Sequence, residues 1–146
     1  MEIEASAFVG NKSVKTLTIK GAPVIGESAF KSCSALTTVN LGNTTVVGAS
    51  AFESCPLLTS VTATGLETVG TSAFRDCATL TTINVSNDEK VLTLGDTAFD
   101  LCPAVKEIYI NQPLSYESGS NWFASSAIVE KSELYNFNER EFDSLG

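Results

Sequence analysis

One block of apolar and polar positions recurs along the chain, and it is clearest in residues 25–41, IGESAFKSCSALTTVNL. Related blocks occupy residues 47–63, 69–85 and 94–110, and an earlier copy starts at Ile3. The phenylalanines near their centres are Phe8, Phe30, Phe52, Phe74 and Phe99. The first four are evenly spaced, and the interval to the last is longer by three because residues at or near 87–89 are inserted. A period in the twenties with one short apolar stretch per unit predicts a solenoid of stacked coils.

The end of each block follows the pattern L-x-x-V-x-L, as in Leu36, Val39 and Leu41. Alternation of apolar, often β-branched residues with polar ones predicts a short strand whose inward side chains complete the core. Stacked about 4.8 Å apart, one strand per coil, these segments are expected to form a single parallel sheet along the solenoid.

The middle of each block predicts one short helical turn. A serine or threonine stands two positions before each phenylalanine, where its hydroxyl is expected to cap the turn: Ser6, Ser28, Ser50, Ser72 and Thr97. A row of nucleophilic serines is the alternative, but it needs a base, and the chain contains no histidine. A glycine four positions before the phenylalanine in the later copies predicts a tight turn or a close approach between coils.

The string [IVL]-G-x-[ST]-A-F-x-x-C-x-x-L-x-x-[VI]-x-[LIV] resembles the BspA-like, or treponemal-type, leucine-rich repeat from residue 3 to about 112. Three positions depart from it: Glu4 replaces glycine, Asn11 replaces cysteine, and Ala63 is small at an apolar position. The resemblance implies an α/β repeat solenoid, a right-handed superhelix with a short parallel β-sheet on the concave face and helical turns on the convex face. It also implies adhesion or protein binding by a cell-surface or secreted protein of host-associated bacteria or some protist parasites.

The pattern divides the chain into two parts. Residues 1–112 are expected to hold five repeats with a period in the low twenties, and residues 113–146 a degenerate sixth repeat and a C-terminal cap. Gly119 and Phe123 keep the spacing of the repeat, while the later apolar residues fit it only loosely. Such a cap would shield the last open coil. The alternative for Trp122 and Phe123 is an aromatic docking patch.

The charge balance excludes some partners. The net charge is −8, from 17 acidic and 9 basic residues. An acidic surface repels phosphate groups, so nucleic acid and anionic membrane surfaces are poor candidate partners. No stretch approaches the roughly 20 apolar residues of a membrane span. Residues 1–10 have neither the basic start nor the hydrophobic run of a signal peptide, so none is expected in them. Because the first coil opens in mid-repeat, we expect the chain to derive from a longer precursor, and a surface or secreted location stays the expectation.

The cysteines occur once per coil, at Cys33, Cys55, Cys77 and Cys102. A zinc site needs ligands that converge tetrahedrally, commonly from two close pairs, which this spacing does not provide. Inward thiols held in parallel seldom have the torsion of a disulfide. The expectation is a packed, reduced cysteine ladder rather than a metal, disulfide or catalytic site, with no cofactor.

The outward side chains of the predicted strands are the candidate binding residues: Thr16, Thr18, Thr38, Asn40, Ser60, Thr62, Thr82, Asn84, Glu107 and Tyr109. Side chains alternate across a strand, so these are expected to line the solvent face of the sheet. One interpretation is that threonine and asparagine merely suit an exposed strand, with no ligand. The other is a rigid hydrogen-bonding surface for an extended protein or a glycan, with Tyr109 as an anchor.

Three functions follow as hypotheses. The first is a non-enzymatic adhesion module that binds a host matrix protein, a cell-surface protein or a glycan. The second is a structural spacer that displays another domain and has no ligand. An enzyme is disfavoured, because the chain has no histidine, no glycine-rich phosphate loop and no acidic pair in a recognisable motif. Self-association is a further expectation, since the first coil exposes Ile3, Phe8 and Leu17.

Overall fold

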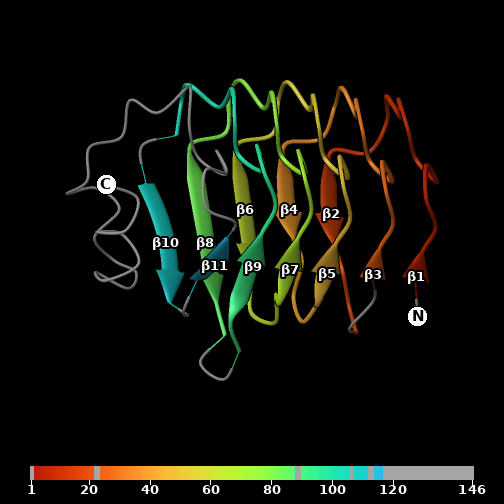
Figure 1. Ribbon diagram of the computed structural model, residues 1–146. Helices are drawn as coiled ribbons and strands as arrows, with labels where there is room; N and C mark the ends of the chain where they lie inside the picture. The colour runs from red at the N-terminus through yellow and green to blue at the C-terminus, as the bar shows by residue number, and fades with distance from the viewer. Residues whose placement is uncertain (1, 22–23, 88–89, 106, 112–113, 117–146) are drawn as a thin grey trace.

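The computed structural model describes residues 2–21, 24–87, 90–105, 107–111 and 114–116, which form a stack of parallel-stranded coils (Figure 1). Each coil contributes one strand to each of two sheets. The five-stranded sheet contains β2 (Thr16–Thr18), β4 (Thr38–Asn40), β6 (Ser60–Ala63), β8 (Thr82–Ser86) and β10 (Glu107–Asn111). The six-stranded sheet contains β1 (Glu2–Ile3), β3 (Val24–Ile25), β5 (Val46–Val47), β7 (Thr68–Val69), β9 (Leu92–Leu94) and β11 (Leu114–Tyr116).

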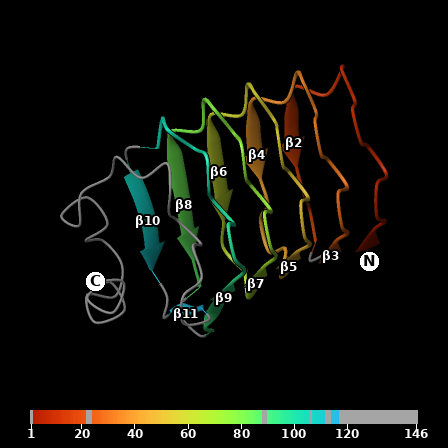
Figure 2. The same ribbon diagram turned by 45° about the horizontal axis from the view of Figure 1, so that its top comes forward.

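The five-stranded sheet is the one that the L-x-x-V-x-L pattern predicts. Its strands pair in parallel and in sequence order along the stack, as Figure 2 shows. In β4 the central Val39 is buried and its neighbours Thr38 and Asn40 face outward. The inward residues of successive strands therefore stack in one column of the core, which is the expected consequence of period-two alternation.

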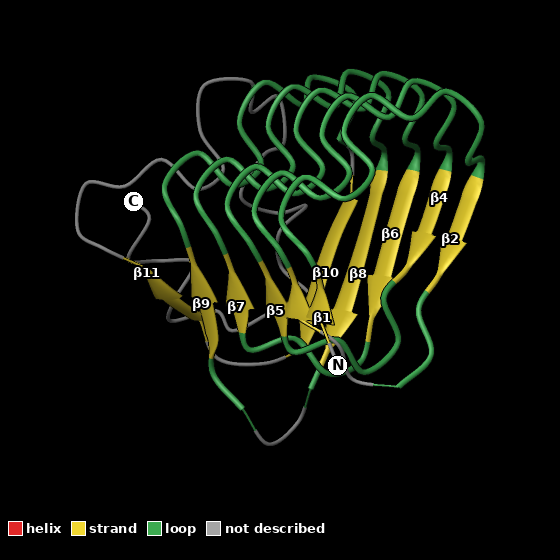
Figure 3. Cartoon of the chain, turned by 90° about the vertical axis from the view of Figure 1, so that its right-hand side faces the viewer, coloured by secondary structure: helices red, strands yellow, loops and turns green. Residues whose placement is uncertain are grey.

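The six-stranded sheet was not expected from the sequence. Four of its strands, β3, β5, β7 and β9, end on the apolar residue that directly precedes a glycine, as Ile25 precedes Gly26. Ile25 is fully buried, so this column forms a second wall of the core. Figure 3 shows the two rows of strands and, across from them, a third side made of loops.

The strand register locates the insertion. Thr82 pairs with Ser60, one repeat period earlier, whereas the pairing of Thr93 with Thr68 spans three positions more than one period. The extra residues therefore lie between the end of β8 and the start of β9. Both ladders keep a continuous parallel register on either side of the insertion. Asp88 and Glu89 lie outside the described residues.

The expected helical turns are not confirmed, because the described part of the chain contains no helix. The third side consists of turns in which the residues two before and two after the phenylalanine are left-handed, with φ of 57° at Ser28 and 58° at Ser32. Within a coil, Lys31 N donates to Ser28 O at 3.1 Å; between coils, Phe30 N donates to Ala51 O at 2.8 Å. Backbone N–H groups of the turn thus donate alternately within the coil and to the next coil. Because no helix begins at these serines, they do not occupy N-cap positions.

The core is a continuous stack of identical layers. The phenylalanine rings lie face to face, with centroid separations of 5.0, 5.3, 5.1 and 5.2 Å from Phe8 through Phe99. A Cβ added at Gly70 would lie 2.6 Å from the backbone nitrogen of Ala49 in the preceding coil. The glycine column therefore serves close approach between coils. Glu4 takes that position in the first described coil, where no described residue lies on the side that its Cβ faces.

Several expectations concern residues outside the described part. They include Gly119, Trp122, Phe123 and the proposed C-terminal cap. The boundary between residues 1–112 and 113–146 stays a prediction.

Candidate binding face

The five-stranded sheet aligns the candidate residues in two outward columns. Register pairs Thr16, Thr38, Ser60 and Thr82 in one column, and Thr18, Asn40, Thr62 and Asn84 in the other. We call these eight side chains the Thr/Asn face. The backbone register continues both columns to Glu107 and Tyr109 on β10, whose side chains lie outside the description.

Most side chains of the Thr/Asn face have no hydrogen-bond partner within the described residues. This holds for the second-column residues Thr18, Thr62 and Asn84, and for Thr16, Thr38 and Ser60 in the first column. Two residues differ: Thr82 Oγ1 lies 3.5 Å from Thr81 Oγ1, and Asn40 Oδ1 accepts a hydrogen bond from Gly42 N at 3.0 Å. The Asn40 amide is thereby oriented, and its NH₂ group remains available as a donor.

The hydroxyls beside the face are used within the fold. Thr37 Oγ1 donates to Lys15 O at 2.9 Å, Thr59 Oγ1 to Thr37 O at 2.9 Å, and Thr81 Oγ1 to Thr59 O at 3.1 Å. At the other end of the strands, Thr64 Oγ1 donates to Gly42 O at 3.1 Å. These threonines tie each coil to the one before it. Their role was not expected from the sequence, although a threonine at the same position of three successive coils was a visible signal.

The face carries no charge on its central strands. None of the residues of β4, β6 and β8 is ionisable. β2 is the strand at the N-terminal end of this sheet. Lys15 lies just before β2 and Lys20 lies two positions after it, and both are exposed. The middle of the face is thus a neutral surface on a chain of net charge −8.

The four cysteines are free and buried on the inner side of the turns. Each thiol donates to the carbonyl of a phenylalanine in the preceding coil: Cys33 to Phe8, Cys55 to Phe30, Cys77 to Phe52 and Cys102 to Phe74, over 3.2–3.3 Å. Burial raises the pKa of the Cys55 thiol to about 12. The pKa of Cys77 is raised by its hydrogen bond to Cys102 and by burial. The same hydrogen bond lowers the pKa of the Cys102 thiol. The enclosed thiols of Cys55 and Cys77 stay protonated, which makes these two cysteines poor nucleophiles and poor metal ligands.

The first coil departs from this arrangement at Asn11. Its Oδ1 accepts hydrogen bonds from Ser13 N and Val14 N, both at 2.8 Å, and so closes the turn locally.

In the described part of the chain no group of three or more histidine, cysteine, aspartate or glutamate side chains is placed to hold a metal ion.

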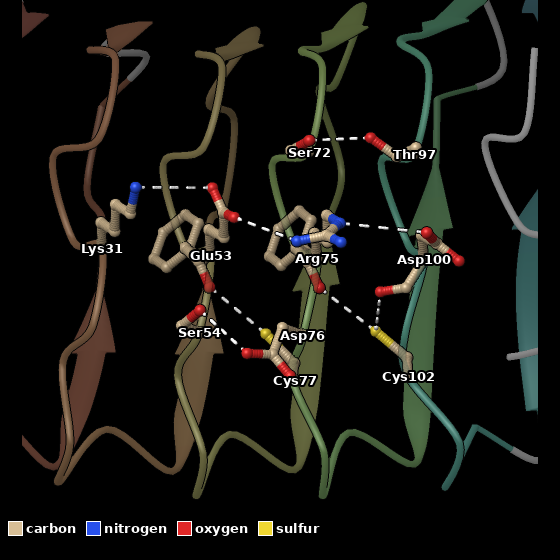
Figure 4. A network of polar contacts seen from close by, with 12 residues as sticks. Lys31, Glu53, Ser54, Ser72, Arg75, Asp76, Cys77, Thr97, Asp100 and Cys102 are labelled. Atoms are coloured by element: carbon tan, nitrogen blue, oxygen red, sulfur yellow. Dashed lines mark hydrogen bonds and ion pairs between the residues drawn. The ribbon is translucent and has the colours of Figure 1, made fainter. Parts of the chain in front are cut away.

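The turn side carries alternating charges at the position after the phenylalanine (Figure 4). Lys31 Nζ lies 3.8 Å from Glu53 Oε1, Arg75 Nη1 lies 3.6 Å from Glu53 Oε2, and Arg75 Nε lies 3.9 Å from Asp100 Oδ2. Nearby, the hydroxyls of Ser72 and Thr97 are 2.7 Å apart. These charges neutralise one another between coils, so this side offers no uncompensated charge along the row.

Comparison with protein families decides the classification. The family model described as the BspA type leucine rich repeat region matches residues 1–130 in six copies. The chain belongs to the BspA-type leucine-rich repeat family. Repeats of this family are generally protein-interaction or adhesion modules, and such solenoids are typically non-enzymatic.

Comparisons with curated proteins and with solved structures gave no match. Among the described residues there is no helix of the length and apolarity needed to cross a membrane.

Proposed function

We propose that this BspA-type repeat chain is a non-enzymatic adhesion module of a cell-surface or secreted protein, and that it recognises its partner through the Thr/Asn face. The observation that carries the proposal is the contrast between neighbouring hydroxyls. Thr37, Thr59 and Thr81 are hydrogen-bonded to the fold, whereas Thr18 and Thr62 have no partner in the described residues. A rigid sheet with unused donors and acceptors can bind a partner without first losing internal hydrogen bonds.

The turn side supports the same choice by contrast. Its charged side chains already pair along the row from Lys31 to Asp100. Its backbone amides are paired within coils and between them. Recognition there would have to break existing interactions, so the Thr/Asn face is the better candidate surface.

Two triple variants test the proposal. One changes Thr18, Thr62 and Asn84 to lysine on the face and spares Asn40, whose side chain supports the turn at Gly42. The matched control changes Ser34, Thr71 and Ala78 to lysine, all exposed on the turns and equal in added charge. Both are compared with the unmodified chain for adhesion to matrix glycoproteins and to cells at physiological salt.

The expected result is that the face variant loses adhesion and the turn variant keeps it, with both unfolding at the same temperature as the unmodified chain. Equal adhesion by all three proteins would contradict the assignment of the face. Absence of adhesion by all three would favour the spacer, which displays another domain and needs no ligand.

Self-association through the first coil is the second candidate property. Phe8 is 42% exposed and Val9 48% exposed, because one face of the Phe8 ring stacks on Phe30 and no described ring covers the other. Sedimentation velocity of the unmodified chain and of Phe8→Ser tests it. A concentration-dependent dimer that the substitution abolishes is expected, and a monomer at all concentrations would contradict it.

A further inference from the structure

The charge, spacing and alternation of the side chains on the Thr/Asn face favour one class of ligand. We propose that it binds a neutral, linear β-1,4-linked glycan that lies along the solenoid axis with one sugar ring per coil. This inference rests on the proposed function, since it names the partner of the same face. Three features carry it: the charge of the face, the spacing of the coils and the alternation along one column.

Charge complementarity favours a neutral polymer. The strands β4, β6 and β8 carry no ionisable residue, so neither an acidic nor a basic chain gains an ion pair there. The chain's net charge of −8 also repels sulfated or carboxylated glycans at longer range. The side chains present hydroxyl and amide groups, which both donate and accept hydrogen bonds, as sugar hydroxyls do. The methyl groups of Thr18 and Thr62 offer small apolar contacts to the C–H groups of a ring.

The coil spacing fits a sugar better than a peptide. Adjacent strands of a sheet lie about 4.8 Å apart, and the stacked phenylalanine rings on the turn side are separated by 5.0–5.3 Å. An extended β-1,4-linked chain advances by about one coil spacing per ring, so that every ring would meet equivalent groups. An extended peptide along the same direction advances only about 3.3 Å per residue and would fall out of step with the coils.

The second column alternates between two residue types. Along the stack it runs Thr18, Asn40, Thr62, Asn84. An extended β-1,4-linked chain turns alternate rings over, so that its repeat is two rings. The period of two coils in the column therefore matches the period of two rings, and each amide would meet the same side of every second ring. Asn40 is already held in one orientation by Gly42 N, which limits the ordering cost of binding.

Matched oligosaccharides test the proposal by isothermal titration of the full chain. Cellohexaose and N-acetylchitohexaose are the β-1,4-linked probes, and maltohexaose, with the composition of cellohexaose but α-1,4 linkages, is the control. Binding of at least one β-1,4-linked probe and none of maltohexaose is expected. Affinity should rise from cellobiose to cellotetraose, because the tetraose spans the four coils of the face.

Single substitutions assign the site. Thr62→Lys at the centre of the face is expected to weaken binding by about tenfold or more, which corresponds to about 1.4 kcal/mol. Thr71→Lys, the same substitution on an exposed turn, is expected to leave the affinity unchanged. Failure of both β-1,4-linked probes to bind, equal binding of maltohexaose, or equal loss with Thr71→Lys would overturn the glycan assignment.

The adhesion assay separates this inference from the proposed function. If the face triple variant loses adhesion to a matrix protein stripped of glycans while no oligosaccharide binds, the face is the binding site and its partner is a polypeptide. If the face variant adheres normally and no oligosaccharide binds, both proposals fail.

Discussion

The Sγ atom of Cys77 donates a hydrogen bond to the carbonyl oxygen of Phe52, 3.2 Å away in the preceding coil. Cys33, Cys55 and Cys102 make the same contact with their own preceding phenylalanines. A small side chain that fills a buried site and also satisfies a carbonyl explains why cysteine recurs without forming disulfides or metal sites. The cysteine row thus joins the coils through weak hydrogen bonds, three of them buried and the one from Cys33 partly buried.

Replacement of Cys77 by alanine is expected to lower the free energy of unfolding by about 2 kcal/mol, because it removes buried volume and leaves the Phe52 carbonyl without its thiol donor. Urea denaturation followed by circular dichroism measures the effect. Cys77→Ser restores a donor and is expected to lose less. An alanine variant as stable as the unmodified chain would contradict the role of this contact.

The Cys55 thiol predicts a dependence of stability on alkaline pH. Its pKa is raised by burial to about 12 from an ordinary value of 9.0. Between these values the folded state keeps a proton that the unfolded state loses, so this thiol lowers the free energy of unfolding as pH rises from about 9 toward 12. Below pH 9 it has no such effect. Denaturation midpoints from about pH 8 to about pH 11 are expected to fall less steeply for Cys55→Ala, and identical slopes would contradict the assignment.

The glycine column predicts a large steric effect. Gly70→Ala would place a Cβ 2.6 Å from Ala49 N and 2.8 Å from the carbonyl carbon of Gly48. The backbone of two coils would have to separate, at a cost of about 2 kcal/mol or more. Glu4→Ala changes the same column where no described coil faces it and serves as the control. Thermal unfolding is the measurement, and a melting temperature equal to that of the Glu4→Ala variant would show that the coils are not in close contact.

Leu101 predicts a stabilising substitution. It has a φ of 55°, a left-handed conformation that is unfavourable for leucine, and its side chain is 38% exposed. Leu101→Asn is expected to raise the free energy of unfolding by about 1 kcal/mol, since asparagine tolerates this region. Leu57, 49% exposed and without positive φ, provides the control through Leu57→Asn. Equal changes in urea midpoint for the two variants would argue against backbone strain at Leu101.

The sequence predicted the parts of the fold that depend on simple periodicity. The alternation around Val39 located the five-stranded sheet, and the phenylalanine spacing located the coils and the insertion. The second sheet was missed because strands of two residues, such as Val24 and Ile25, are too short to show alternation, and the following glycine suggested a turn.

The helical turns, which are not confirmed in the described residues, were predicted for a different reason. Phe30 and Cys33 are three positions apart, which suits one helical turn, and serine suits an N-cap. The left-handed conformations at Ser28 and Ser32 instead open each turn so that its amides reach the next coil. Gly10, with a φ of 70° at the Ser32 position of the first coil, was the one signal of this conformation in the sequence. Which hydroxyls remain free depends on coil-to-coil geometry, which spacing alone does not reveal.

The most direct test of the binding face is a residue-resolved NMR titration of the full chain, isotope-labelled, with whichever matrix glycoprotein or oligosaccharide gives saturable binding. We predict that the amide signals of Thr18, Thr62 and Asn84 shift or broaden, while those of Ser34, Thr71 and Ala78 do not. Perturbation of the turn residues with an unchanged Thr/Asn face would contradict the assignment.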